Sequence, residues 1–136
     1  MTDIKGLRII AVLEFLTGVG LILFWIGFFT IGLAPENPPS CYFAYEHSFP
    51  LPDFILALAV LASSILLLRN KESGKILSFI CAGGLIFLGL LDFSFNIQNG
   101  IYTLSALDLV LNAFINIWCV GFGVVIAVLL GRKYFA

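Results

Sequence analysis

Four long apolar stretches divide the chain, at residues 7–33, 52–68, 76–96 and 106–130. Each is close to the about 20 residues that an α-helix needs to cross the hydrocarbon core of a bilayer, and none alternates as a membrane β-strand does. Because hydrocarbon offers no partner to backbone N–H and C=O groups, each stretch is expected to be helical. The pattern predicts an all-α membrane protein, with a single four-helix transmembrane domain over residues 1–136.

The composition agrees with a lipid environment. Hydrophobic residues make up 61% of the chain, charged residues make up 11%, and the mean hydropathy is +1.11. Soluble domains carry about 25% charged residues. The net charge is −1 and no basic patch with interleaved aromatic residues occurs, so no nucleic-acid partner is expected. The lipid bilayer is the predicted partner, and a homo-oligomer is left open.

All basic residues lie on one side of the predicted membrane. The seven Lys and Arg occur near the N-terminus, in residues 69–75 and at residues 132–133, while the connections at residues 34–53 and 97–104 contain none. Since short loops that carry Lys and Arg stay in the cytoplasm, both termini of this multi-pass protein are predicted to be cytoplasmic, in a cell membrane. Residues 34–53 and 97–104 then face the outer side.

The longest connection, residues 34–53, is rich in proline and aromatic residues. It contains all five prolines of the chain, which favour extended structure over regular helix. Its aromatic residues are Tyr42, Phe43, Tyr45 and Phe49. Aromatic rings are favoured at the membrane–water interface, so this outer loop is expected to pack on the mouth of the bundle or to lie in the interface.

Glu14 lies about two turns into the first apolar stretch, where an ionisable side chain costs roughly 2.5–3.5 kcal/mol at a helix centre. One interpretation is a buried carboxylic acid, kept neutral and hydrogen-bonded to a neighbouring helix. The alternatives are a carboxylate that binds a proton or a ligand, and a carboxylate reached by water from the cytoplasmic side.

A polar stripe marks the last apolar stretch. Asp108, Asn112 and Asn116 recur at every fourth residue and therefore share one helix face. Hydrocarbon does not solvate such a stripe, so it is expected to face the bundle interior or another subunit. Ser105 and Asp108 have the spacing of a capping box, which makes Asp108 a candidate helix cap. Asn112 and Asn116 are candidates for bonds between helices or for a ligand-lining role.

Further polar residues are predicted at the same depth. Asp92 and Asn96 come near the outer end of the third stretch, and Glu46, His47 and Asp53 lie in the outer loop. These residues and the stripe predict a polar pocket that is open to the outer side. The candidate ligand-binding residues are Glu46, His47, Asp53, Asp92, Asn96, Asp108, Asn112 and Asn116.

No pattern in the sequence is specific for a reaction or a cofactor. The chain has one His and lacks the spacings of a metal site, its serines lack a nucleophile-elbow motif, and Cys41, Cys81 and Cys119 form no C-x-x-C pair. No metal, cofactor or catalytic residue is therefore assigned. Trp25 is expected in the outer aromatic belt, and Trp118 is expected to face lipid or to pack.

Three functional hypotheses remain. The first is a non-catalytic membrane protein whose outer pocket binds a small ligand, a cation or another ion, or a partner segment, with transport requiring an oligomer. The second is a small membrane enzyme that acts on a lipid or lipophilic substrate at the outer interface, with Glu46, His47, Asp53 or Asp92 as acid–base groups. The third is a structural or assembly subunit whose polar residues join helices.

Overall fold

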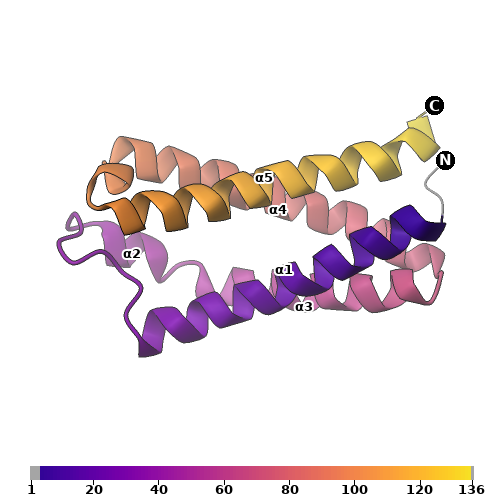
Figure 1. The fold of residues 1–136 in the computed structure, drawn as a ribbon, viewed down its shortest axis with the longest axis horizontal. Coiled ribbons are helices and arrows are strands. Elements are labelled where there is room, and N and C mark those ends of the chain that lie inside the picture. The colour runs from indigo at the N-terminus through magenta and orange to yellow at the C-terminus, as the bar shows by residue number, and fades with distance from the viewer. Residues whose placement is uncertain (1–3, 136) are drawn as a thin grey trace.

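Four long helices dominate the computed structural model (Figure 1). The structure describes residues 4–135, and the side chains of residues 4–132. The long helices are α1 (Ile4–Thr30), α3 (Pro50–Leu68), α4 (Glu72–Gln98) and α5 (Ala106–Phe135), with a short helix α2 (Tyr42–Glu46) and a 3₁₀ turn η1 (Ile101–Thr103) in the connections. Four helical segments are long and apolar enough to cross a membrane, so the prediction of an all-α, multi-pass membrane protein is confirmed.

The helix ends follow local backbone chemistry. α1 ends at Thr30 rather than at residue 33, because Gly32 adopts a left-handed conformation with φ of 80° and its N–H donates to the Gly27 carbonyl. α4 is longer than predicted at both ends: it begins after the extended Lys71 and continues to Gln98, shortly before the left-handed Gly100. Glycine tolerates this conformation, and α1 and the α4–η1 connection turn at these points.

The outer loop is more ordered than its prolines suggest. The prediction of extended structure without helix is wrong for residues 42–46, which form α2, and α3 begins at Pro50, two residues before the predicted start at residue 52. Three prolines precede α2, and Pro50 and Pro52 lie in the first turn of α3, so none interrupts a helix. Pro50 occupies the first turn of α3, where a backbone N–H has no helical partner in any case. Asp53 therefore lies in a helix and not in a loop.

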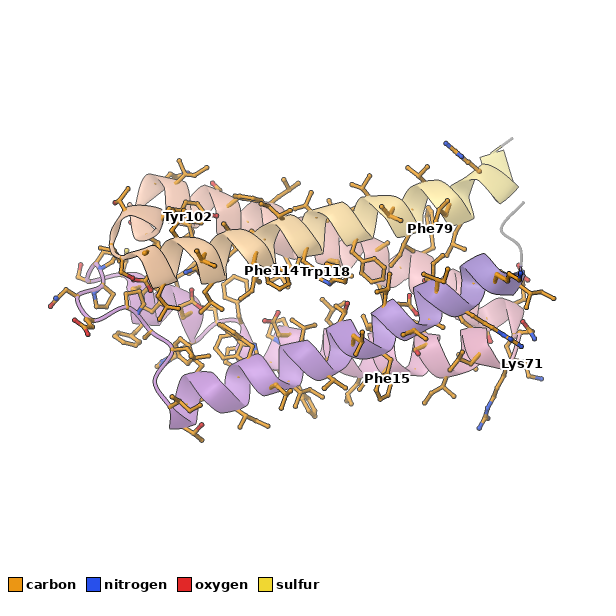
Figure 2. All side chains as sticks on the ribbon, in the orientation of Figure 1. Phe15, Lys71, Phe79, Tyr102, Phe114 and Trp118 are labelled. Atoms are coloured by element: carbon orange, nitrogen blue, oxygen red, sulfur yellow. The ribbon has the colours of Figure 1, made fainter. Side chains whose placement is uncertain are left out.

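The long helices are packed in chain order, α1 against α3, α3 against α4 and α4 against α5. Both termini and the α3–α4 connection lie at one end of the bundle, here called the terminal end, and Lys71 marks it in Figure 2. α2 and η1 lie at the opposite end, the loop end (Figure 1).

The first and last helices in this order meet at the terminal end and diverge toward the loop end (Figure 1). A buried apolar cluster joins them there, with Leu7 and Ile10 on α1 and Phe122 and Ile126 on α5. Apolar burial therefore holds α1 and α5 together at one end only.

Close helix contacts depend on glycine. A Cβ atom at Gly123 of α5 would lie 2.8 Å from the Ala82 carbonyl oxygen and 2.7 Å from Ile86 Cγ1 on α4. The carbonyl belongs to the backbone and cannot rotate away. The close approach of α4 and α5 therefore requires a residue without a side chain at position 123. Gly121, on the exposed face of α5, has no neighbour within 4 Å of the corresponding position outside its own helix.

We expect Gly123→Ala to lower the free energy of unfolding by about 1–3 kcal/mol, because the added methyl group forces α4 and α5 apart. Gly121→Ala is the matched control, and its better helix propensity should leave stability unchanged or raise it by about 1 kcal/mol. Thermal unfolding in detergent measures both. Equal stability of the two variants would contradict the close contact.

Cys41 allows the expected orientation to be tested, because it is exposed near the loop end while Cys81 and Cys119 are buried. We expect a membrane-impermeant maleimide added outside intact cells to label Cys41. The control is Ser73→Cys in a Cys41→Ser background, in the exposed first turn of α4 at the terminal end, which should react only after permeabilisation. Labelling of Ser73→Cys but not of Cys41 in intact cells would show that the loop end faces the cytoplasm.

Candidate functional site

A cavity of about 580 Å³ lies between α1 and α5, extending from the loop end toward the middle of the bundle. Its two sides are largely apolar, and α2, α3 and α4 contribute the remaining lining residues. Figure 2 shows Phe114 and Trp118 on the side of α5 that is turned to α1. The apolar lining is formed chiefly by Leu16, Leu21, Phe24, Leu111, Phe114 and Ile115.

Acid and amide side chains from four elements reach this cavity. Glu46 comes from α2, Asp53 from α3 and Asp92 from α4, and α5 contributes Asn112 and Asn116. Asp92 of α4 and the two amides of α5, which the sequence places at similar depth, therefore line the same cavity.

Asp92 lies at the centre of the polar groups. Its carboxylate accepts a hydrogen bond from the Tyr45 hydroxyl at 3.2 Å and one from the Asn96 amide at 3.3 Å. Asn116 is a further side-chain partner of Asp92. The Tyr45 ring stacks on Phe95 with ring centroids 3.6 Å apart. This stacking fixes α2 against α4, and α2 thereby brings Glu46 to the cavity.

Trp25 and Asp53 join α1 to α3 beside the cavity. The buried Trp25 indole N–H donates to Asp53 Oδ2 at 2.9 Å. The Trp25 N–H group therefore points into the protein, and the position of this residue in an outer aromatic belt stays a prediction. The interaction satisfies both a buried donor and one carboxylate oxygen, as a low-dielectric site requires.

Asn116 has one satisfied and one unsatisfied group. Its amide nitrogen donates to the Tyr102 hydroxyl at 2.6 Å, which ties α5 to η1. Its Oδ1 atom has no hydrogen-bond partner among the described residues, although the side chain is 1% exposed and lines the cavity. A buried acceptor without a donor is costly, by about 1–3 kcal/mol, and marks a position that a donor group can occupy.

Trp118 and Thr17 bridge α5 and α1 at the inner end of the cavity. The Trp118 indole N–H donates to Thr17 Oγ1 at 3.0 Å, and the Thr17 hydroxyl donates to the Leu13 carbonyl at 2.7 Å. Trp118 was expected either to face lipid or to pack inside the bundle, and its bond to Thr17 corresponds to packing. Trp118 and Asn116 both line the cavity. The spacing of Leu111, Ile115 and Trp118 on one helix face is the local signal for this role.

The other predicted ligand-binding residues do not line the cavity. His47 is exposed and its ring lies near Phe28, Phe29 and Phe43. Asp108 caps α5: its N–H donates to Ser105 Oγ at 3.0 Å, and the Ser105 hydroxyl donates to its carboxylate at 2.6 Å. Asn96 is also absent from the lining, and its amide donates to the lining residue Asp92.

Glu14 lies outside the cavity, in the terminal half of the bundle. Its side chain is 0% exposed, and its Oε1 atom accepts a hydrogen bond from the Ser78 hydroxyl of α4. Nearby, the Ser64 hydroxyl donates to the Ala11 carbonyl at 2.6 Å. This arrangement corresponds to the interpretation of Glu14 as a buried acid that is bonded to a neighbouring helix.

Among the residues that the structure describes, no three His, Cys, Asp or Glu side chains are grouped closely enough to hold a metal ion. Comparison with known proteins gives no match to a protein family, a curated protein or a solved structure. The functional proposal is therefore based on the cavity itself.

We expect Thr17→Val to remove the acceptor of the Trp118 indole and to show a coupling energy of about 1 kcal/mol with Trp118→Phe in a double-mutant cycle. Thr30→Val is the control, because its hydroxyl makes the same type of bond within α1, to the Ile26 carbonyl at 2.6 Å. Unfolding in detergent gives the free energies. Additive effects of Thr17→Val and Trp118→Phe would show that the bridge contributes no stability.

Proposed function

We propose that this membrane protein is non-catalytic and that the cavity between α1 and α5 binds a small ligand in the outer half of the bilayer. The topology belongs to the same proposal: a single transmembrane domain with both termini cytoplasmic and the loop end outward. The absence of Lys and Arg from residues 34–53 and 97–104 supports this orientation.

The convergence of Glu46, Asp53 and Asp92 on one cavity carries the proposal. These acids lie on three different elements, and no Lys, Arg or His is among the lining residues. Acidic side chains in a membrane domain are expensive and are usually associated with a function. A largely apolar pocket with a few polar groups at one end is also the usual form of a small-molecule site.

An enzymatic function receives less support. General acid–base chemistry needs catalytic groups within hydrogen-bond reach of the reacting atoms, often with a second residue that positions them. In the described hydrogen bonds, none joins two of the candidates Glu46, Asp53 and Asp92. His47, the remaining candidate, points to aromatic rings outside the cavity.

A structural role is the second candidate, and the hydrogen bonds between helices favour it. Trp25–Asp53, Glu14–Ser78 and Trp118–Thr17 each connect two long helices. Such bonds between helices account for the presence of buried polar residues, and no bound ligand is needed to explain them. They leave the space between α1 and α5 unexplained, because a purely structural core is close-packed. Transport through this small bundle would require an oligomer.

We expect an uncharged probe, ω-bromo-octanol, to bind in the cavity and to quench tryptophan fluorescence saturably in lipid nanodiscs. Both tryptophans of the chain, Trp25 and Trp118, line the cavity, and bromine quenches only at short range. Gly20→Leu should abolish the saturable component, because Gly20 lines the cavity and has open space at its Cβ position.

Gly121→Leu is the matched control, since it adds the same side chain to an exposed position without a neighbour within 4 Å. It should retain saturable quenching. Quenching that Gly20→Leu and Gly121→Leu leave equally unchanged would indicate collisions from the bilayer and would contradict a ligand-binding cavity.

A further inference from the structure

We infer that the ligand of this cavity is an amphipathic ammonium ion, with its head in the part of the cavity that Glu46, Asp53 and Asp92 line and its apolar chain between α1 and α5. The inference rests on the proposed function and specifies the chemical class of the ligand. Three features of the cavity support it: its charge, its free acceptor and the position of its apolar edge.

The charge of the cavity is one-sided. Glu46, Asp53 and Asp92 contribute three carboxyl groups, and no basic side chain is among the lining residues. The Lys and Arg residues of the chain lie instead at residues 5–8, 69–75 and 132–133, at the terminal end. A bound cation therefore stabilises the ionised form of these carboxyl groups, whereas a carboxylate or a phosphate gains no opposite charge there, because like charges in a low-dielectric site are strongly unfavourable.

The hydrogen-bonding groups of the cavity also match an ammonium ion. Asn116 presents a buried Oδ1 atom that lacks a donor. Asp92 accepts bonds from Tyr45 and Asn96 and has Asn116 as a further partner, and an ionised carboxylate has about four acceptor sites. An ammonium group supplies three N–H donors and no acceptor, so it can satisfy these oxygens without introducing an unmatched group.

The apolar edge of the cavity faces the bilayer. Leu16 and Leu23 of α1 and Phe114 of α5 line the cavity and are also 57%, 59% and 65% exposed. At the loop end, by contrast, the side chains of Tyr42 and Glu46 on α2 are buried. An alkyl chain therefore has contact with the cavity and with lipid at the same time, which suits a ligand that arrives from the membrane.

The test compares three probes with the same brominated chain in phosphatidylcholine nanodiscs: ω-bromo-octylamine, ω-bromo-octanol and ω-bromo-octanoate. For each probe, binding is measured as the saturable quenching that occurs in the unmodified protein and is lost in Gly20→Leu. We expect the amine to bind at least about tenfold more tightly than the alcohol, and the carboxylate to bind most weakly.

The double variant Asp53→Asn with Asp92→Asn should reduce the preference for the amine to less than about twofold, because it removes two of the three acids. The new amide oxygens can still accept from Trp25 and Tyr45, and thermal unfolding checks that the fold is kept. Asp108→Asn is the control: it removes a carboxylate near the same end, at the helix cap outside the cavity, and should keep the full preference.

Each outcome has a separate meaning. Binding of the alcohol as tightly as the amine, with both sensitive to Gly20→Leu, would overturn the ammonium inference and leave the ligand-binding function intact. Insensitivity of all three probes to Gly20→Leu would overturn the function as well. The ranking of probes in the unmodified protein decides the inference even if the double variant does not fold.

A final arm separates two sources of the ammonium group. Replacing part of the phosphatidylcholine by phosphatidylethanolamine should leave binding of the amine unchanged if the natural ligand is a free amine. Competition by phosphatidylethanolamine would instead identify a lipid headgroup as the source. Both results support an ammonium site, and they distinguish its occupants.

Discussion

Hydrocarbon cannot form hydrogen bonds, and this constraint governs how every polar side chain of the bundle is placed. Glu14 turns to Ser78, Asp53 to Trp25 and Asp92 to Tyr45, each across a boundary between elements. Three buried oxygen atoms, Glu14 Oε2, Asn96 Oδ1 and Asn116 Oδ1, lack a partner among the described residues. Of these residues only Asn116, which is almost completely buried, borders the cavity.

The cavity follows from the order in which the helices pack. Because α1 contacts α3, α3 contacts α4 and α4 contacts α5, the first and last helices each have one long neighbour along most of their length. They meet at the terminal end through Leu7 and Ile126, and in the middle through Trp118 and Thr17. Beyond that bridge they diverge, and the space between them is bordered by exposed apolar side chains on one side and by acids on the other.

The number of long helices could be predicted from the sequence, because the length and hydropathy of an apolar stretch determine whether it enters a bilayer. The sequence also identified the Ser105–Asp108 cap, which depends only on residues three positions apart. α2 was not predictable in this way. Five residues do not form a stable helix alone, and stacking of Tyr45 on Phe95 supplies the tertiary support.

The residues that line the site could be predicted only in part. Periodicity placed Asn112 and Asn116 on one face, and the predicted depth of Asp92, Asp53 and Glu46 grouped these acids with them, as the cavity lining does. Periodicity does not determine how far each helix is rotated toward its neighbours, so it did not separate these residues from His47, nor reveal that Thr17 receives the Trp118 N–H. Those assignments depend on packing between segments that are distant in the chain.

The hydrogen bond between Glu14 and Ser78 has a consequence for biogenesis, because its two residues are 64 positions apart. A ribosome delivers α1 to the membrane well before α4 has been made. During that interval the carboxyl group of the first helix lacks the hydroxyl that later binds it, and unsatisfied polar groups in lipid are unfavourable. The nascent first helix should therefore stay near the protein-conducting channel or its chaperones until the third long helix arrives, so that insertion and assembly of this small protein are one coupled event.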